Sequence, residues 1–371
     1  MNLRKFLIPI LSLFFVAFSC REDDESFETF TDRDRQEVYD ENEEEILTYL
    51  ESHFFNYEDF DFADATNPIN NNFTVALDTV SLDNGTQDKT PIINYLNQAD
   101  GVYPRLDVKI VNQDEIDYNL YILKVREGDG DSINKLDSAA MIYSGSVVDG
   151  TVFDSAVNVE NGQPFNLTGV GSVGGVVPGF REGIVEFKTS TGFTNNTDGS
   201  ITFNGHGIGV VFMPSGLGYF SLPPSAAIPQ YSPLFFNLKI ISRSNTDFDL
   251  DGMPSHLEHP DGDITGAEDN VDGDLLVNFI DNDDDGDGVL TRDEVEQKVY
   301  EDDGSTGALQ FMSKAEAQTY FDTNITSPDE IFISIEGELD GTFTLNTLVV
   351  PDDNNDGIPN YLDETVTTVI E

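Results

Sequence analysis

The acidic residues of the last third of the chain recur at a fixed spacing, which restricts what that region can fold into. Residues 283–294 read DDDGDGVLTRDE, with acids at the first, third, fifth and twelfth positions and glycine at the sixth. Oxygen ligands at alternate positions converge on one cation when the chain wraps round it, and the last acid can bind through both oxygens. The segment therefore predicts a calcium loop with the ligands Asp283, Asp285, Asp287 and Glu294.

Two further segments, 247–258 and 352–363, repeat this register. Their expected ligands are Asp247, Asp249, Asp251, Glu258, Asp352, Asn354, Asp356 and Asp363. A degenerate copy spans 270–281, where Leu275 stands in the glycine position. The Asp-Gly-x-Pro motif of the two outer copies resembles thrombospondin type 3 calcium repeats more than paired EF-hand helices. We expect structural calcium, since extracellular modules bind it at ~10⁻⁴ to 10⁻³ M; the alternative is a solvated acidic tail.

The whole chain is strongly acidic, with 70 acidic against 18 basic residues and a formal charge of −52. This balance argues against nucleic acid as a partner, because phosphates require Lys and Arg. It also disfavours docking of a basic patch on anionic lipid. The four histidines show no zinc-ligand grouping with cysteine, and we expect them at the surface or in loops.

Residues 1–19 are predicted to be a secretion signal. Arg4 and Lys5 precede the apolar run FLIPILSLFFVAF, which is shorter than the roughly 20 residues of a membrane-spanning helix. An ordinary secreted protein is one interpretation. However, Cys20 is the only cysteine, and the ending VAFSC resembles the lipobox of bacterial lipoproteins, in which this cysteine is acylated. We therefore expect lipidation at Cys20 and no internal disulfide in the mature chain.

Residues 20–40 are acidic and poor in large apolar side chains, which is typical of a solvated tether. An acidic run directly after a lipidated cysteine resembles the surface-export signal of Bacteroidetes lipoproteins. We therefore expect an outer membrane lipoprotein, facing the periplasm or the cell surface, that is held at the membrane by its lipid anchor only.

Three regions follow the tether. Residues 41–115 predict a small mixed α/β arm, with helical spacing in EEEILTYLESHFFN and strand-like alternation in NFTVALDTVSL. Residues 116–243 contain the strand-like runs YNLYILKV, AAMIYSGSVV, ITFNGHGIGVVFM and SPLFFNLKII, and one short helical segment, PGFREGIVEFK. We expect an α+β fold in which an antiparallel sheet wraps around that helix. Residues 244–371 are expected to form an extended calcium-loop region, in which residues 300–350 carry no pattern that we can assign.

The middle region resembles the FKBP-type peptidyl-prolyl cis–trans isomerases. The blocks YSGSVVDGTVFDSA, PFNL, GGVVPGFREGI, MPSGLGY and IPQYSPLFFNLKI come in the order and spacing of that family. The resemblance implies a pocket formed by Tyr143, Phe153, Asp154, Phe165, Val176, Val177, Phe180, Tyr219, Ile228 and Phe236. Phe180 stands where the family usually has tryptophan. Without the ordered blocks, this alternation of Phe and Val would favour an ordinary β-domain core.

The resemblance also implies a chemistry without a nucleophile. Rotation about an X–Pro bond faces a barrier of ~20 kcal/mol because the amide must lose its resonance. The twisted amide is less polar, so a dry aromatic pocket would bind it better than the planar form. By resemblance, Tyr219 and the Ile228 N–H would bind the substrate backbone, and Asp154 would face the twisting carbonyl and accept a hydrogen bond from Tyr143.

Catalysis of this kind needs no cofactor, and its substrates are proline-containing polypeptides. Two other classes of function remain open at this point. One is a peptide-binding module that has lost useful turnover, and the other is a calcium-dependent adhesin that uses the fold as a scaffold. The sequence leaves the oligomeric state open.

Overall fold

The computed structural model describes residues 31–157, 164–168, 175–259, 269–301, 309–337 and 341–370. It divides into two units, Met1–Arg33 and Asp34–Glu371, and the fold described below is that of the second. The predicted signal, Cys20 and the first part of the tether lie outside the described residues. Within the described ranges, no helix is both long enough and apolar enough to cross a membrane.

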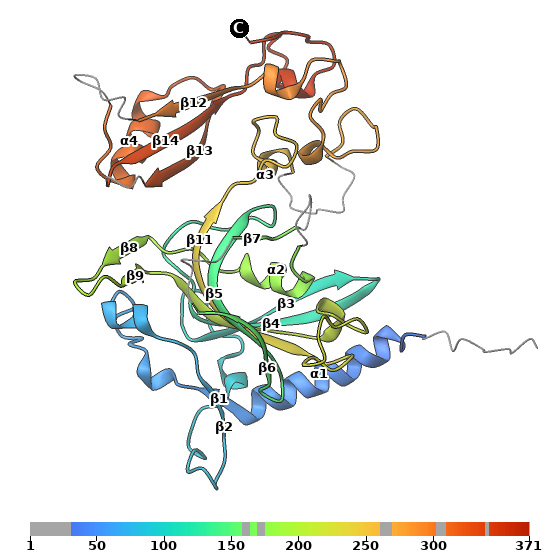
Figure 1. Cartoon of the computed structure of the whole chain (residues 1–371), viewed down its shortest axis with the longest axis vertical. Coiled ribbons are helices and arrows are strands. Elements are labelled where there is room, and N and C mark those ends of the chain that lie inside the picture. Colours follow the sequence, from blue (N-terminus) through green and yellow to red (C-terminus); the bar gives the residue numbers. More distant parts are fainter. Residues whose placement is uncertain are drawn as a thin grey trace, which may run out of the picture. The chain divides into compact units, whose positions relative to one another are not determined.

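A seven-stranded antiparallel sheet forms the centre of the fold (Figure 1). Its strand order is β3 (Arg105–Gln113), β4 (Ile116–Arg126), β10 (Gly207–Met213), β11 (Leu234–Ser244), β5 (Ser138–Val147) and β6 (Val152–Ala156), with β7 (Phe165–Asn166) also paired to β5. A separate hairpin joins β8 (Gly192–Asn195) to β9 (Ile201–Asn204). Each of the four strand-like runs of the sequence contains a strand of the sheet.

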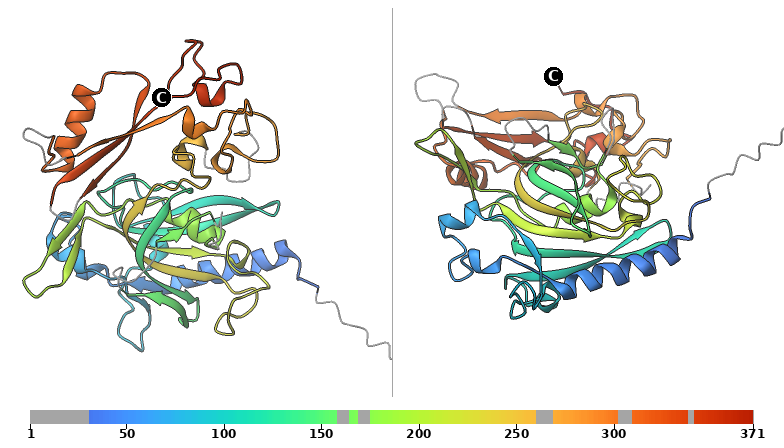
Figure 2. Two further views of the ribbon diagram at one scale, coloured as in Figure 1. Left: turned by 45° about the horizontal axis from the view of Figure 1, so that its top comes forward. Right: turned by 60° about the horizontal axis from the view of Figure 1, so that its bottom comes forward.

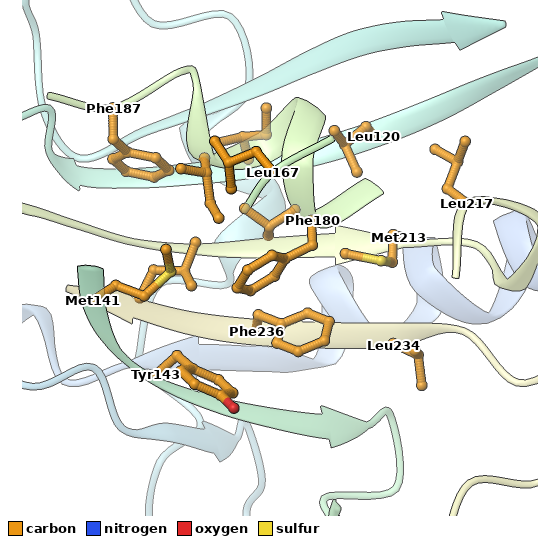
Figure 3. Close-up of a cluster of buried hydrophobic side chains, with 14 of the residues drawn as sticks. Leu120, Met141, Tyr143, Leu167, Phe180, Phe187, Met213, Leu217, Leu234 and Phe236 are labelled. Atoms are coloured by element: carbon orange, nitrogen blue, oxygen red, sulfur yellow. The ribbon is translucent and has the colours of Figure 1, made fainter. Parts of the chain in front are cut away.

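Helix α2 (Pro178–Ile184) packs on one face of this sheet. Proline at its first position suits a helix start, because the missing N–H would have no partner there. The helix lies directly on β10, since a Cβ atom built on Gly183 would come within 2.6 Å of the Val211 side chain. Phe180 and Ile184 join the apolar cluster of this face (Figure 3). The expected antiparallel sheet around a short helix is confirmed.

The opposite face of the sheet is covered by the N-terminal region. Helix α1 (Arg35–Ser52) begins at the N-cap Asp34, whose side chain accepts a hydrogen bond from the Glu37 amide. Ile46, Tyr49 and Leu50 of this helix pack with residues of β4, β10 and β11 in a second cluster, on the side away from α2 (Figure 2). Because strand side chains alternate, Ile208, Val210 and Phe212 belong to this cluster, whereas Val211 and Met213 belong to the first. The central strand is therefore buried on both faces.

This arrangement corrects the predicted arm and tether. The hairpin of β3 and β4 turns at Asp114 and Glu115, with φ of 51° and 64°. Part of region 41–115 is therefore an edge strand of the sheet. Helix α1 starts within the predicted tether, where Val38 is buried. In place of the expected strand NFTVALDTVSL, only β2 (Leu77–Thr79) forms, paired with β1 (His53–Phe55).

The C-terminal region contains a second small sheet. Strands β12 (Glu296–Tyr300), β14 (Phe343–Val349) and β13 (Glu330–Gly337) pair antiparallel in this order. Helix α4 (Lys314–Asn324) packs on them through Ala317. Residues 300–350, for which the sequence showed no assignable pattern, thus contribute to a folded α/β unit. The sequence analysis had predicted only extended loops here. A short helix, α3 (Ser255–Glu258), closes the first acidic loop.

Short 3₁₀ helices connect these elements. They span Tyr57–Asp59, Pro68–Asn72, Ile92–Tyr95, Ser215–Leu217, Asn278–Ile280, Thr291–Asp293 and Asn360–Leu362.

Candidate active site and candidate calcium loops

Six aromatic side chains that the sequence analysis singled out converge on the α2 face of the sheet. Phe180 of α2 lies at their centre, with its ring centroid 4.7 Å from that of Phe236 and 6.0 Å from those of Phe165 and Tyr143. Figure 3 shows Phe180 above Phe236 of β11, with Tyr143 of β5 beside them. We call this set the aromatic cup: Tyr143, Phe153, Phe165, Phe180, Tyr219 and Phe236.

Some rings of the aromatic cup are buried, and other members are partly exposed. Phe180 and Phe236 are 3% and 4% exposed. Phe153 and Tyr219, with ring centroids 6.4 Å apart, are only half-buried. Val176 and Val177, just before α2, and Phe165 are likewise half-buried against the same cluster, and Ile228 is buried in it. All the predicted pocket residues except Asp154 therefore belong to one apolar cluster or pack against it.

Two hydroxyl groups give the cup its polar side. Tyr143 Oη donates to Asp154 Oδ2 at 2.7 Å. Burial, together with this hydrogen bond and the Asp154 charge, raises the pKa of Tyr143 far above its ordinary value. Burial and Asp154 also raise the pKa of Tyr219. Both phenols therefore keep their protons at neutral pH and can act as hydrogen-bond donors.

The Ile228 amide is engaged within its own loop. Its N–H donates to the Ser225 carbonyl at 3.2 Å. A substrate carbonyl that binds this N–H, as the resemblance implies, has to replace Ser225. The loop therefore needs a small rearrangement to supply the expected donor.

Helix α1 fixes the ends of the segment that carries Tyr219 and Ile228. Asn42 Oδ1 accepts from the Ser215 amide at 2.7 Å, and its Nδ2 donates to the Tyr231 carbonyl at 2.8 Å. Asn42 is 3% exposed, so both bonds are shielded from water. Sequence reasoning missed this residue because its partners lie more than 170 positions further along the chain.

Gly145 is a second site residue that the sequence analysis missed. A Cβ atom at this position would lie 2.6 Å from Phe236 Cε1 and 2.8 Å from Phe153 Cζ. Gly145 pairs with Phe236 in β11 and with Asp154 in β6. Only glycine lets both rings lie against the strand. A glycine inside a strand-like run, here in YSGSVV, was the available signal for such a close approach.

The three complete acidic loops share one backbone path. Their sixth-position glycines, Gly252, Gly288 and Gly357, have φ of 96°, 94° and 96°. Their fourth-position residues, Leu250, Gly286 and Asn355, have φ of 65°, 69° and 60°. The degenerate loop has φ of 75° at Gly273, its fourth position, but no left-handed residue at Leu275. The glycine register of the sequence thus corresponds to a real turn.

Acidic oxygens converge inside the first, second and degenerate loops, whereas Asp352, Asp356 and Asp363 of the third loop do not form such a group among the described residues. Asp247, Asp249 and Asp251 have ligand atoms within 4.8 Å of one another, as do Asp283, Asp285 and Asp287, and also Asp272, Asp274 and Asp281 of the degenerate loop. Glu294 is 1% exposed. Burial and the aspartates of its loop raise its pKa to about 8. Carboxylate oxygens are the ligands that calcium prefers, so the donor set fits this cation.

In the third loop, positions three and twelve meet directly. Asn354 Nδ2 donates to Asp363 Oδ2 at 2.8 Å. Asp352 accepts from the amides of Asp356 and Gly357, just as Asp247 accepts from those of Asp251 and Gly252. The outer loops are therefore built alike, although the third is the more exposed.

One comparison with known proteins bears on the middle region of the chain. Residues 130–241 match the family model described as FKBP-type peptidyl-prolyl cis-trans isomerase. No curated protein sequence matches the chain. Among solved structures, a peptidyl-prolyl cis-trans isomerase from Pseudomonas syringae pv. tomato is 19% identical, with a TM-score of 0.27, over 37% of this chain and 80% of that one. FkpA from Escherichia coli is 23% identical, with the same TM-score of 0.27, over 37% of this chain and 51% of its own length. The chain therefore carries, over residues 130–241, an FKBP-type peptidyl-prolyl cis–trans isomerase domain.

Proposed function

We propose that the chain isomerises X–Pro bonds in polypeptides of the cell envelope, with the twisted amide held in the aromatic cup. The observation that carries the proposal is the convergence of aromatic rings from β5, β7, α2 and β11 around one buried floor. Family membership of residues 130–241 supports the reaction type.

The cup acts by differential binding. Phe180 and Phe236 meet at an interplanar angle of 65° and provide an apolar floor for the pyrrolidine ring. An amide that loses conjugation becomes less polar, so its transfer from water into this floor costs less than the transfer of the planar amide. The difference lowers a barrier of ~20 kcal/mol without any proton transfer.

The polar groups orient the substrate. Tyr219, which is protonated and partly exposed, donates to a substrate carbonyl. Tyr143 holds Asp154 beside the cup through their 2.7 Å hydrogen bond. The Ile228 N–H exchanges Ser225 for a substrate carbonyl when the peptide binds. Each of these steps positions the peptide for rotation about its X–Pro bond.

We further propose that lipidation of Cys20 anchors the protein in the outer membrane. The segment between Cys20 and helix α1 comprises residues 21–34, which reach at most about 50 Å when fully extended. This length lets the folded part stand clear of the lipid head groups. The sequence of the leader supports this location, and labelling of the lipidated cysteine in fractionated membranes tests it.

Calcium in the acidic loops is the remaining element of the proposal. The shared left-handed turns at Gly252, Gly288 and Gly357 support it. Neutralising the buried carboxylates removes their mutual repulsion, so calcium stiffens the region. A titration with CaCl₂ followed by melting temperature tests this, and an unchanged melting temperature at millimolar calcium contradicts it.

The isomerase proposal is tested by following cis–trans exchange of Ala-x-Pro-Phe peptides with the whole chain. Phe236→Ala and Asp154→Ala should each reduce kcat/KM at least tenfold. Leu82→Ala and Asp88→Ala, at exposed positions outside the cup, are the matched controls and should leave it unchanged. A parent chain that binds the peptides without accelerating exchange would instead be a binding module.

A further inference from the structure

One acidic cluster does not follow the loop register. Asp251 and Glu258, at positions five and twelve of the loop 247–258, have ligand atoms within 4.8 Å of each other and of Asp284. Asp284 belongs to the next complete loop, 283–294, where it occupies position two. The register assigns no ligand to that position. We call these three residues the inter-loop cluster.

All three side chains of the inter-loop cluster are buried. Asp251, Glu258 and Asp284 are 1%, 3% and 1% exposed. Among the described residues, neither carboxylate oxygen of Glu258 has a hydrogen-bond partner, and the same is true of Asp284 Oδ1. In that part of the chain, no ion pair reaches any of the three. Buried carboxylates without a compensating charge are strongly unfavourable.

Thr291 orients Asp284 toward the cluster. Its hydroxyl, which is fully buried, donates to Asp284 Oδ2 at 3.0 Å. It also accepts from the Asp284 amide at 3.3 Å. One oxygen of Asp284 is thereby satisfied inside its own loop, while Oδ1 is left for a ligand outside it.

Other contacts around the two loops do not depend on the carboxylates of the cluster. Phe279, between the loops in sequence, lies with its ring centroid 5.9 Å from that of Phe248 and 5.3 Å from that of His259. Gln297 Nε2 donates to the Gly252 carbonyl at 2.9 Å. The three acids therefore converge within a packed region of the chain. A solvated acidic tail would not hold them together in this way.

We propose that Asp284 joins Asp251 and Glu258 in binding one calcium ion, which links the loops 247–258 and 283–294. Oxygen donors at this separation suit a hard divalent cation, and the unpartnered oxygens of Glu258 and Asp284 are the ligands that the cluster offers. The inference rests on the proposed calcium binding of the loop 247–258. It adds a ligand from the neighbouring loop, so that filling one loop stabilises the other.

The experiment is a calorimetric titration of the whole chain with CaCl₂, together with melting in EDTA and in calcium. Asp284→Asn removes one charge and keeps an oxygen to accept from Thr291. Asp293→Asn is the matched control, because it removes one charge from a half-exposed position of the same loop. We expect Asp284→Asn to raise the Kd of one calcium site at least tenfold and Asp293→Asn to change it less than threefold.

A double-mutant cycle identifies the ion concerned. If Asp251 and Asp284 bind the same calcium, Asp251→Asn combined with Asp284→Asn weakens binding by much less than the product of the two single effects. Melting provides a readout that does not depend on binding. Asp284→Asn should melt at a temperature equal to or higher than that of the parent in EDTA, because repulsion is relieved, and at a lower temperature in calcium.

The outcomes separate the two proposals. If the parent binds calcium and Asp284→Asn behaves like Asp293→Asn, the link between the loops is wrong while calcium binding within the loops stands. Additive effects of Asp251→Asn and Asp284→Asn overturn it in the same way. A parent that binds no calcium at millimolar concentration overturns both the inter-loop site and the proposed calcium loops.

Discussion

Gly145→Ala is the sharpest test of the aromatic cup. The added methyl group would lie 2.6 Å from Phe236 Cε1 and 2.8 Å from Phe153 Cζ. Carbon atoms pack favourably at about 3.5–4.0 Å, so each ring has to retreat by roughly 1 Å. Strand β5 is paired with β11 and β6 at this position, so we expect the rings to move rather than the backbone. A misplacement of about 1 Å can cost ~10²-fold in rate.

We therefore expect Gly145→Ala to lower kcat/KM about 100-fold in the peptide exchange assay. Overpacking should at the same time lower the free energy of unfolding by about 1–3 kcal/mol, measured by urea denaturation. Gly337→Ala, in strand β13, is the control, because its Cβ would meet nothing closer than 3.5 Å, and it should change neither quantity. A folded Gly145→Ala chain with activity within twofold of the parent would refute the role assigned to the rings.

Three further predictions concern other parts of the chain. Asn42→Ala frees the loop that carries Tyr219, so we expect a roughly tenfold lower kcat/KM; peptide exchange at the parent rate would contradict this. Burial, followed by the Arg126 charge, lowers the pKa of His206 to about 3. The neutral His206 side chain therefore stabilises the fold fully above the unfolded pKa of about 6.5, and this contribution to the free energy of unfolding falls by about 2 kcal/mol at pH 5. In urea denaturation, His206→Phe should make the free energy of unfolding depend less steeply on pH, and equal slopes for variant and parent would contradict this. Gly288→Ala strains a backbone at φ 94° and should reduce the rise in melting temperature with calcium, whereas an undiminished rise would count against a calcium loop there.

The strands of the isomerase domain and the path of the acidic loops could be predicted from local sequence. Alternation and turn residues mark the strands, and glycine at the sixth loop position marks a left-handed turn. The cup residues could be named because they lie in ordered family blocks. Gly145 and Asp284 could not, because their roles depend on neighbours across the sheet and in another loop.

The N-terminal layer was interpreted wrongly for a physical reason. Helix α1 is rich in glutamate, and its buried residues Val38, Asn42, Ile46, Tyr49 and Leu50 form a narrow stripe. Such a stripe can be recognised as a buried helix face only when the second apolar surface that covers it is known. The sequence of β10 indicated that such a surface exists. Its uninterrupted apolar run, GIGVVFM, is typical of a strand covered on both faces. His206 and His259 lie in loops, as expected, although both are buried.

The burial of β10 on both faces has a consequence for how the chain matures. Helix α1 precedes β10 in the chain, and Tyr49 of α1 packs against Phe212 of β10, which lies 163 positions further along. Contacts of such long range make folding slow and leave apolar surface uncovered meanwhile. Until β10 has joined the sheet, the apolar stripe of α1 therefore has no surface to cover it.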